Sequence, residues 1–574
     1  MPSGSDSDVA CKFLNFFDNK ITSIRNVLDA SCTLDPSFED FYGDFLSSFQ
    51  PATEDEVYNI IKNSPSKHCD LDPMPTFLLK QCLDVLLSPI TNTINNSLES
   101  GVVPQCYKKA LINPLLKKAG LDCEELSNFR PVSNLPFLSK ILEKVVLARL
   151  MSHISFNNLS EVLQSAYKPY HSTETALLKV LTDILHFIDQ KKVCLISLLD
   201  LSAAFDTIDH DILITRLNRT FGISGIALSW LTSYLKDRHQ RVKVGNSFSE
   251  EAVLKFGVPQ GSVLGPILFT MYTQPLAIIL KNHDMHYHLY ADDTQIYRSV
   301  NIENFQDLKF QTEDCIKNVK NWMNINKLKL NDNKTEVILC HSPRQSIQGM
   351  SISLNINGHE IKNSCKIRNL GVIFDENLSM SDQVTSICQK SYFQLRKIAS
   401  VRNYLTEFAT TTLVTTLILS NLDYCNSLLS GITNDNLKKL QSIQNFAAKI
   451  IKRKKKYDHV TPILFDLHWL PVEQRIIYKI CLLCYKALNG CTPSYLSDLI
   501  PNYVPNRTLR SSSDQRILSK PKTHYKFYGE RSFSFFGPSV WNDLPLALRY
   551  LSSVNTFKKK LKRHLFVETF NAHF

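Results

Sequence analysis

The chain has 574 residues, 44% of them apolar and 21% charged, which is enough to bury a large core and too many for one ordinary domain. No uncharged apolar run reaches the roughly 18 residues of a membrane-spanning helix, and the N-terminus lacks the basic and then apolar pattern of a secretory signal. We therefore expect an intracellular protein without membrane association. Its 15 cysteines lie mostly in apolar runs, which indicates buried, reduced thiols.

The net charge of +11 is unevenly distributed. Residues 451–574 carry +13, and residues 1–450 carry −2. Two runs contribute most visibly to this excess, KRKKK at 452–456 and KKKLKR at 558–563. Such clusters suit phosphate backbones or nuclear import. A solvated helix face is the alternative for either run taken alone.

The first elements expected along the chain are helices. Residues 1–50 have a helical pattern and are expected to be only loosely tied to the rest of the chain. Thr53, three residues before Glu56, predicts a helix N-terminus with a capping box. After three prolines, a second helix is expected over 77–87.

The region that continues to about residue 345 mixes strand-like and helical patterns. The clearest segments are strand-like at 193–199, 242–244 and 288–297, and helical at 138–153 and 226–235. This alternation predicts an α+β or α/β unit. Residues 383–451 are nearly all helical in pattern, and the rest of the chain is helical and then rich in loops.

Asp200 ends an apolar, β-branched run, and a helix is expected to begin near Asp209. An Asp at the end of a buried strand can hold a metal ion while the sheet fixes its backbone. A lone Asp at such a place is more often a cap or turn residue. The assignment therefore depends on partners elsewhere in the chain.

A glycine-rich segment, FGVPQGSVLGPILF, begins at Phe256 and leads into an apolar helix. Glycine lets another group approach the backbone closely, and a helix N-terminus favours anions. Gln260 in this segment could contact a base or a sugar. A tight connection is the alternative for the turn taken alone.

Asp292 and Asp293 lie in the segment HLYADDTQIY, at the predicted tip of a β-hairpin. Buried carboxylates cost free energy unless they are paired or bound to a cation. With Asp200 they can converge on two Mg²⁺ ions, which prefer oxygen ligands and need few protein carboxylates. Two such ions can activate an attacking hydroxyl and stabilise a leaving pyrophosphate.

In these motifs the sequence resembles the reverse transcriptases of LINE-type (non-LTR) retrotransposons. Tyr290-Ala-Asp-Asp293 resembles the family's YxDD box, DLSAAF from Asp200 its first catalytic-aspartate motif, and Pro259-Gln-Gly261 its template- and nucleotide-positioning motif. The order and spacing of the motifs agree over roughly residues 55–380. Further similar segments lie at 128–150, 164–178, 327–338 and 367–375.

The resemblance implies roles for the matching positions. Asp200 and Asp292 would be catalytic, metal-binding carboxylates, with Asp293 as the second member of the adjacent pair. The backbone carbonyl of Leu201 would be a further ligand of two Mg²⁺ ions, for which Mn²⁺ is an alternative. Phe205 would lie under the sugar as a steric gate, and Gln260 would contact the nucleotide or template.

The resemblance also implies roles for basic residues and for one hairpin. Arg130 and one of Lys117 or Lys118 would hold the triphosphate. Lys334 would lie in the motif that donates a proton to pyrophosphate, and Leu370 with Gly371 in the hairpin that grips the primer.

Phe205 also discriminates between classes of polymerase. Viral RNA-dependent RNA polymerases have a similar layout but usually place an Asp five residues after the first catalytic Asp, where it binds a 2′-hydroxyl. An apolar ring at this position would exclude that hydroxyl. Deoxynucleotides are therefore the expected substrates.

The implied fold is a right-hand polymerase of the α+β class, with an antiparallel sheet in fingers and palm, a helical thumb and a helical C-terminal region. We expect an N-terminal helical extension or linker at 1–54 and fingers and palm at 55–380, with a core at about 98–375. The thumb is expected at 381–455 and a basic C-terminal domain at 456–574. Segments at 437–451, 467–490 and 534–549 are similar to the C-terminal region of chicken-repeat and jockey-related elements.

Cys481 and Cys484, followed by Cys491, have part of the spacing of a zinc site. The first two also follow helical spacing with Ile480 and Leu488, which favours a place in the core.

Proteins of the related group usually carry an endonuclease before the polymerase. The residues before the fingers are too few to form one, and no ribonuclease H unit is recognisable. We therefore expect a chain that copies RNA and needs a separate endonuclease for insertion.

The leading hypothesis is an RNA-directed DNA polymerase that acts on an RNA template, a DNA primer or target DNA, and dNTPs. The alternative is a catalytically silent, truncated or domesticated retrotransposon protein that binds RNA. The presence of every catalytic motif favours the first hypothesis. Enzymes of this type act in the nucleus after assembly with RNA in the cytoplasm, and the KRKKK run is compatible with nuclear import.

Overall fold

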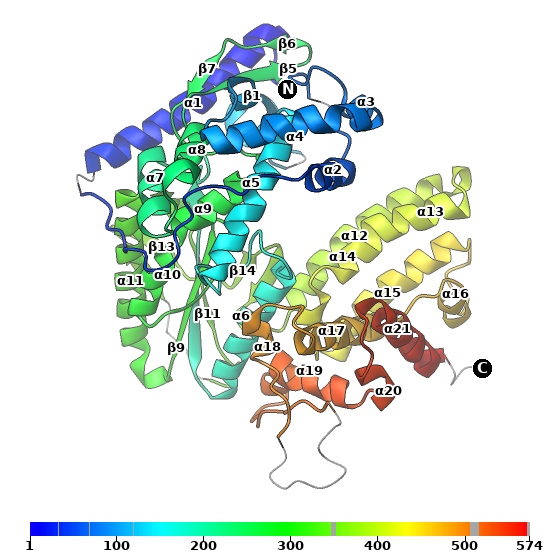
Figure 1. The fold of residues 1–574 in the computed structure, drawn as a ribbon. Coiled ribbons are helices and arrows are strands. Elements are labelled where there is room, and N and C mark those ends of the chain that lie inside the picture. The colour runs from blue at the N-terminus through cyan, green and yellow to red at the C-terminus, as the bar shows by residue number, and fades with distance from the viewer. Residues whose placement is uncertain are drawn as a thin grey trace. The chain divides into compact units, whose positions relative to one another are not determined.

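The computed structural model describes residues 1–31, 34–67, 69–118, 120–345, 352–356, 358–504 and 516–570 (Figure 1). The chain forms two compact units that interleave along the sequence. Unit 1 comprises Met1–Glu161, Asp200–Asn282 and Cys315–Asn331, and unit 2 comprises Val162–Leu199, His283–Asp314 and Asp332–Phe574. Both units combine helices and sheets, which confirms the mixed α and β class. The four consecutive segments expected from the sequence remain a prediction.

Unit 1 contains most of the N-terminal helices and a five-stranded sheet. Its helices are α1 (Asp6–Ser31), α2 (Glu54–Asn63), α3 (Thr76–Gln81), α4 (Leu83–Ser100), α5 (Phe137–Phe156), α7 (His210–Arg219), α8 (Gly225–Leu235), α9 (Gly265–Thr273) and α10 (Leu276–Asn282). Its strands are β1 (Lys109–Leu116), β2 (Phe129–Asn134), β4 (Leu201–Ser202), β5 (Arg238–Val244), β6 (Ser247–Phe248), β7 (Ala252–Leu254) and β10 (Lys329–Leu330). Helix α11 (Phe305–Ile325) contributes residues to both units.

The sheet of unit 1 has the order β2-β1-β5-β6, with β7 also paired to β5. Strands β1 and β5 are parallel, and β1 and β2 form an antiparallel pair. Helix α1 packs against this sheet through Phe13 and Phe17, which share a buried cluster with Ile112 and Val242. The expectation that residues 1–50 are only loosely tied to the rest is therefore wrong, because their apolar helix face completes the core of the sheet.

Unit 2 contains a second sheet and most of the C-terminal helices. Its strands are β3 (Val193–Leu199), β8 (His286–Tyr290), β9 (Asp293–Val300), β11 (Glu336–Cys340), β12 (Ser353–Ile356), β13 (His359–Lys362), β14 (Lys366–Asn369) and β15 (Val372–Asp375). Its helices are α6 (Thr173–Asp189), α12 (Ser381–Val401), α13 (Glu407–Val414), α14 (Ser420–Asp423), α15 (Asn434–Ile451), α16 (Thr461–Asp466), α17 (Val472–Leu488), α18 (Ser494–Ser497), α19 (Phe533–Asn542), α20 (Leu546–Arg549) and α21 (Val554–Phe570).

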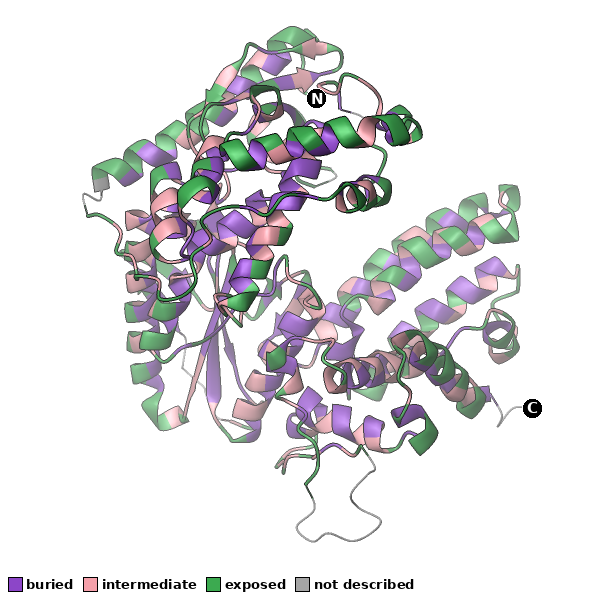
Figure 2. Ribbon diagram, viewed as in Figure 1, coloured by how far each residue is buried: buried purple, intermediate pink, exposed green. Residues whose placement is uncertain are grey.

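The central sheet of unit 2 is antiparallel, with the order β11-β3-β9-β8. Strand β3 has the predicted bounds, and all but one of its residues are buried (Figure 2). An apolar run without alternation is expected for a strand covered on both faces. The sheet therefore supplies a rigid base for the residues at its ends.

One hydrophobic core joins this sheet to the C-terminal helices. Ile196 of β3 and Tyr297 of β9 belong to the same buried cluster as Trp541 of α19 and Phe557 of α21. The two cysteines with zinc-like spacing, Cys481 and Cys484, are buried in this core on α17, which confirms their structural assignment. Residues 456–574 therefore share their apolar core with the sheet.

The local elements agree with the sequence patterns where capping and periodicity are strong. Helix α2 begins after Thr53, whose side chain accepts a hydrogen bond from the Glu56 N–H group. Helices α5 and α8 include the predicted stretches and extend slightly beyond them. The helix expected at 77–87 is instead divided between α3 and α4, with Cys82 between them.

Two expectations from composition can be compared with the structure. Within the described residues, no helix is both long and apolar enough to cross a membrane. Cys194, Cys340 and Cys425 are buried as expected, but other cysteines are exposed, namely Cys82, Cys106, Cys123 and Cys365. These four lie in helical or loop segments at the surface rather than in the sheets.

Candidate active site

Asp292 and Asp293 lie at the turn of the β8–β9 hairpin, as predicted. Tyr290 pairs with Asp293, so Ala291 and Asp292 form the two-residue turn. Ala291 has a φ of +56°, a left-handed conformation that is unfavourable for a residue with a side chain. Such local strain is retained where the surroundings enforce it, often at functional sites.

Gln164, which lies in the Val162–Leu199 segment of unit 2, holds Ala291 in this conformation. Its side-chain oxygen accepts hydrogen bonds from the N–H groups of Ala291 (3.1 Å) and Ala166 (2.9 Å). Its amide group also donates to the Ala291 carbonyl at 3.5 Å. Backbone bonds between Leu163, Ser165 and Leu289 add a short parallel pairing to β8. The side chain of one buried glutamine therefore binds both the N–H group and the carbonyl of Ala291.

The inner face of the hairpin is braced by a buried polar chain. His288 Nε2 lies 2.8 Å from Ser165 Oγ, which lies 2.8 Å from the Tyr495 hydroxyl on α18. The Tyr495 hydroxyl donates a further hydrogen bond to Thr175 at 3.2 Å. Burial lowers the pKa of His288 to about 3, so the imidazole is neutral at ordinary pH. Through this chain the C-terminal region contacts β8, the strand that leads into the turn of the paired carboxylates.

Neither of the two aspartates is fully buried. Asp292 is half-buried and Asp293 is exposed. Burial raises the pKa of the Tyr167 hydroxyl, and the negative charges of Asp292 and Asp293 raise it further. Tyr167 therefore lies within the electrostatic field of this pair.

Asp200 directly follows strand β3, whose last residue, Leu199, pairs with Thr294 of β9. The Asp200 carbonyl accepts a hydrogen bond from the Asn331 N–H group at 2.8 Å, and Leu201 pairs with Leu330. The backbone on the C-terminal side of Asp200 is therefore fixed by β10.

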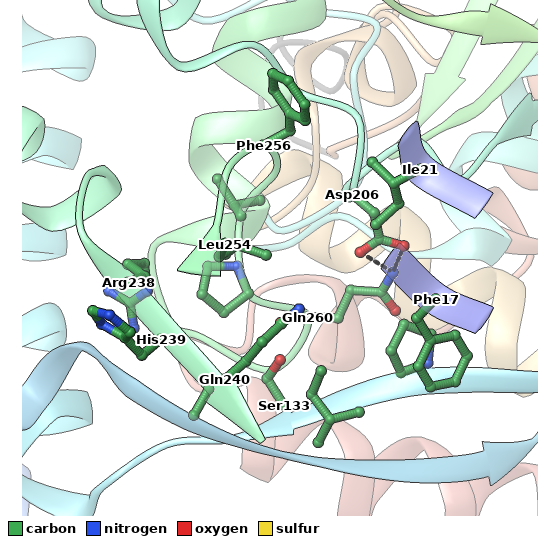
Figure 3. Close-up of a pocket in the computed structure, with 15 residues that line it drawn as sticks. Phe17, Ile21, Ser133, Asp206, Arg238, His239, Gln240, Leu254, Phe256 and Gln260 are labelled. Carbon is green, nitrogen blue, oxygen red and sulfur yellow. Dashed lines mark hydrogen bonds between the residues drawn. The ribbon is translucent and has the colours of Figure 1, made fainter. Parts of the chain in front are cut away.

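A small pocket in unit 1 surrounds Gln260 and Asp206 (Figure 3). Gln260 Nε2 donates to both carboxylate oxygens of Asp206, each at 2.9 Å. Phe17 of α1 and Ser133 of β2 also line the pocket. The amide of Gln260 is thus oriented by a carboxylate that the sequence motifs did not single out.

The loop that carries Gln260 passes so close to other backbone segments at Gly257 and Gly261 that only glycine fits there. A Cβ atom on Gly261 would overlap the Ser133 carbonyl oxygen, and Gly261 has a φ of +121°. A Cβ atom on Gly257 would lie 2.7 Å from the Asp206 Cα. The Ser133 N–H group also donates to the Gln260 carbonyl at 2.8 Å. These contacts fix the loop against β2 and the segment that follows Asp200.

Glu143 on α5 anchors the other end of this loop. Its Oε2 atom accepts hydrogen bonds from the N–H groups of Val263 (2.7 Å) and Leu264 (3.0 Å) and from the Tyr234 hydroxyl (3.1 Å). Burial raises the pKa of Glu143, while these donors and the charge of Arg238 oppose that rise. The carboxylate satisfies N–H groups at the start of α9 that would otherwise be buried without partners.

Phe205 is half-buried and packs against an aromatic partner. Its ring stacks on Phe269 of α9 with centroids 4.5 Å apart. The Phe205 carbonyl accepts a hydrogen bond from the Val258 N–H group at 2.9 Å. The position of the ring is therefore coupled to the glycine-rich loop.

The basic residues assigned to triphosphate binding share one end of the β1–β2 hairpin. Arg130 pairs with Leu115, and Lys117 and Lys118 continue the chain just beyond β1. All three side chains are exposed. Lys117 Nζ also donates to the Ser127 carbonyl at 2.6 Å.

The remaining predicted positions lie in unit 2. Lys334 is exposed and ends a short 3₁₀ helix, Asp332–Lys334. Leu370 and Gly371 form a two-residue hairpin turn between β14 and β15, with φ angles of +42° and +87°. The Tyr424 hydroxyl donates to the Leu370 carbonyl at 2.7 Å. Their roles toward primer and pyrophosphate remain predictions.

Replacement of Asp206 by asparagine is expected to remove a pH-dependent contribution to stability. Burial raises the pKa of Asp206 from 3.8 to about 6, so the folded protein binds this proton more tightly than the unfolded chain. The contribution is fully present below pH 3.8 and is lost as the pH rises through about 6. Urea unfolding midpoints of the wild type should therefore fall relative to those of Asp206→Asn between about pH 4 and about pH 7. Parallel pH profiles for the two proteins would contradict the assignment.

Asp206, Gln164 and Glu143 are thus the residues that sequence motifs alone did not identify. Each lies inside a segment recognised for another reason, and each acts through a partner far away in the sequence. A polar side chain within an otherwise apolar run, as at Glu143, was the available signal.

Residues 116–374 match the family described as reverse transcriptase (RNA-dependent DNA polymerase). The chain is 26% identical over 436 residues to a probable RNA-directed DNA polymerase from transposon BS of Drosophila melanogaster, covering 74% of this chain and 47% of that protein. It is 25% identical over 412 residues to a probable RNA-directed DNA polymerase from transposon X-element of the same species, covering 71% and 44%. Identity to the RNA-directed DNA polymerase from mobile element jockey of that species is 25% over 343 residues, covering 59% and 36%.

The chain therefore spans about half, or less, of the length of these curated relatives. The matched family region includes the hairpin of Asp292 and Asp293, the Gln260 loop and Asp200. Residues 116–374 accordingly belong to the reverse transcriptase (RNA-dependent DNA polymerase) family, and the chain is homologous to the RNA-directed DNA polymerases of jockey-type non-LTR retrotransposons.

Proposed function

We propose that this chain is an RNA-directed DNA polymerase that extends a DNA 3′-OH along an RNA template with dNTPs. The observation that carries the proposal is the strained hairpin turn that presents Asp292 and Asp293 and is held by Gln164. Family membership of the surrounding region supports it, as do the names of the relatives, which are RNA-directed DNA polymerases.

Within this proposal, the sheet β11-β3-β9-β8 corresponds to the palm. The β1–β2 hairpin with its exposed basic residues corresponds to the fingers, and helices α12 to α15 correspond to the thumb. The support for the palm is a buried antiparallel sheet that carries carboxylates at one strand end. The support for the thumb is its helical composition after the last hairpin of the matched region.

Two Mg²⁺ ions would be held by Asp200, Asp292 and Asp293 together with the Leu201 carbonyl. The donors fit, because all are oxygen atoms and Mg²⁺ usually needs only one or two carboxylates besides water and substrate phosphates. Among the described residues, no group of three His, Cys, Asp or Glu side chains is arranged to hold one metal ion, so the convergence of the three carboxylates is part of the proposal. When bound, the metal would activate the primer hydroxyl and stabilise the leaving pyrophosphate.

The support for adding Asp200 to the hairpin pair is the strand register. Leu199, the residue before Asp200, pairs with Thr294, the residue after Asp293. Asp200 therefore leaves β3 at the end of the sheet where β9 begins.

The remaining residues of the proposed site bind and orient the substrates. Phe205, stacked on Phe269, would lie under the sugar and exclude a 2′-hydroxyl. Gln260, oriented by Asp206, would contact the nucleotide or the template. Arg130 and one of Lys117 or Lys118 would hold the triphosphate, Lys334 would donate a proton to pyrophosphate, and the Leu370–Gly371 turn would contact the primer.

Primer extension on poly(rA)/oligo(dT) by the purified chain tests the proposal. With Mg²⁺ we expect dTTP to be incorporated and EDTA to stop the reaction. Because Phe205 excludes a 2′-hydroxyl, rUTP should be incorporated about a hundredfold less efficiently than dTTP. Equal use of rUTP would contradict the role of Phe205. Absence of extension by folded protein that still binds RNA would favour the catalytically silent alternative.

A further inference from the structure

A cavity of about 840 Å³ opens in unit 2 at one end of helices α12 and α15. Five of its lining residues are cationic, namely Arg402, Lys449, Arg453, Lys454 and Lys456, and none of its lining residues in the described chain is acidic. Cations in a concave, acid-free wall reinforce one another's potential and attract anions. The cavity lies outside the segments matched to the reverse transcriptase family.

Several contacts fix the frame of this cavity without using all of its charge. Arg402 donates to the carbonyls of Ile450 (2.9 Å) and Ile451 (2.7 Å), which are the last residues of α15. Lys452 forms an ion pair with Glu407 of α13 at 2.7 Å. Arg402 of the cavity wall and the neighbouring Lys452, which does not line the cavity, thus link the ends of α12 and α15 and join α13 to them.

The cations beyond the end of α15 remain available to a ligand. Arg453, Lys454 and Lys456 are exposed, and none of the ion pairs found among the described residues uses their side chains. They follow the end of α15 at Ile451 within five residues of the chain. Three such charges at the mouth of a cavity suit a phosphate group.

Aromatic rings accompany these charges. Tyr392 and Phe446 line the cavity with ring centroids 6.3 Å apart, and Phe446 is 38% exposed. Three more rings close by in the chain are almost fully exposed, Tyr404 (90%), Phe408 (82%) and Tyr457 (91%). Exposed rings interleaved with cations are typical of surfaces on which nucleobases stack.

We propose that this cavity binds an unpaired nucleotide of a single-stranded nucleic acid. The phosphate would contact Arg453, Lys454 and Lys456, and the base would pack against Tyr392 and Phe446. The volume suits one unstacked nucleotide, since ligand sites of small molecules span roughly 300–1,000 Å³. A duplex keeps its bases stacked inside and presents only its backbone, so it cannot use the aromatic wall. The proposal concerns binding and does not depend on polymerase activity.

Charge reversal in the full chain tests this site better than removal of the basic region. Deletion of residues 451–574 would also remove core residues such as Trp541 and Phe557. The test variant is Arg453→Glu with Lys454→Glu. The control is Lys317→Glu with Lys362→Glu, an identical change of net charge at exposed positions of α11 and β13, outside both basic runs. A third variant, Phe446→Leu, keeps an apolar side chain and removes the aromatic ring.

Binding is measured by fluorescence anisotropy with labelled oligo(rU), oligo(dT) and a duplex, each of about 12 nucleotides per strand. We expect the Arg453/Lys454 variant to weaken single-strand binding about tenfold or more, and the Lys317/Lys362 control to change it less than about twofold. Phe446→Leu should weaken single-strand binding about fivefold and leave duplex binding unchanged.

The three probes distinguish RNA from DNA as the ligand, and they distinguish binding at this cavity from general electrostatic attraction. Loss confined to oligo(rU) identifies RNA as the ligand, and loss confined to oligo(dT) identifies DNA. Equal losses in the Arg453/Lys454 variant and the Lys317/Lys362 control would show general electrostatic attraction and overturn the proposal. Equal losses for duplex and single strand, or no effect of Phe446→Leu on any probe, would also overturn it.

Discussion

Replacement of Asp292 by asparagine is expected to reduce primer extension by about a thousandfold or more. The change preserves the size of the side chain and removes the negative charge that the proposed metal site requires. Loss of several kcal/mol of transition-state stabilisation corresponds to this factor, since about 4 kcal/mol is a thousandfold in rate. The measurement is initial velocity on poly(rA)/oligo(dT) with saturating dTTP and Mg²⁺.

The fold and RNA binding should survive this substitution. Asp292 occupies a half-buried turn position, and RNA affinity comes mainly from phosphate contacts with basic residues elsewhere. Asp284→Asn is a matched control at the other end of the hairpin, where the Asp284 side chain is 93% exposed and forms only a surface pair with Arg298. We expect that variant to keep near wild-type velocity. Undiminished extension by Asp292→Asn would refute the assignment of this carboxylate.

Replacement of Glu143 by alanine is expected to produce the largest loss of stability. Glu143 is 1% exposed, and its carboxylate accepts from two backbone N–H groups and the Tyr234 hydroxyl. Each buried donor left without a partner costs about 1–3 kcal/mol. A loss of about 3 kcal/mol or more in the free energy of unfolding is therefore expected, measured by urea unfolding of the full chain.

Two further variants distinguish a hydrogen-bonding role from a general effect of a substitution in a helix. Glu143→Gln retains a side-chain oxygen for the N–H groups of Val263 and Leu264, so we expect it to recover part of the lost stability. Glu99→Ala changes an exposed glutamate on α4 and should alter the unfolding free energy by less than about 0.5 kcal/mol. Equal midpoints for Glu143→Ala and Glu99→Ala would contradict the anchoring role.

The sequence predicted those elements whose signals are local. The bounds of β3 follow from an uninterrupted apolar run, and the β8–β9 hairpin follows from two β-prone runs around a polar turn. The start of α2 follows from the Thr53 cap. In each case the deciding residues are neighbours in the chain, so periodicity and capping are sufficient.

The remainder depends on partners that are distant in sequence. The buried contact between Gln164 and Ala291 spans more than a hundred positions, and that between Ser165 and Tyr495 spans 330. Helix α1 packs on the unit 1 sheet. Its amphipathic pattern predicts a buried face but does not identify the surface that covers it. The motifs located the proposed carboxylates, but they did not reveal which side chains hold them.

The shared core of unit 2 also has a consequence for protein synthesis. Side chains from Leu177 on α6 to Phe570 at the end of α21 belong to the same buried cluster, and strand β3 lies within it. Chains are made from the N-terminus, and a domain becomes stable as a unit only when its core is complete. The core around strands β3 and β9 therefore cannot be completed until almost the whole chain has been synthesised. A stop codon shortly before α21 would leave this core incomplete, although residues 116–374, which match the reverse transcriptase family, had already been translated.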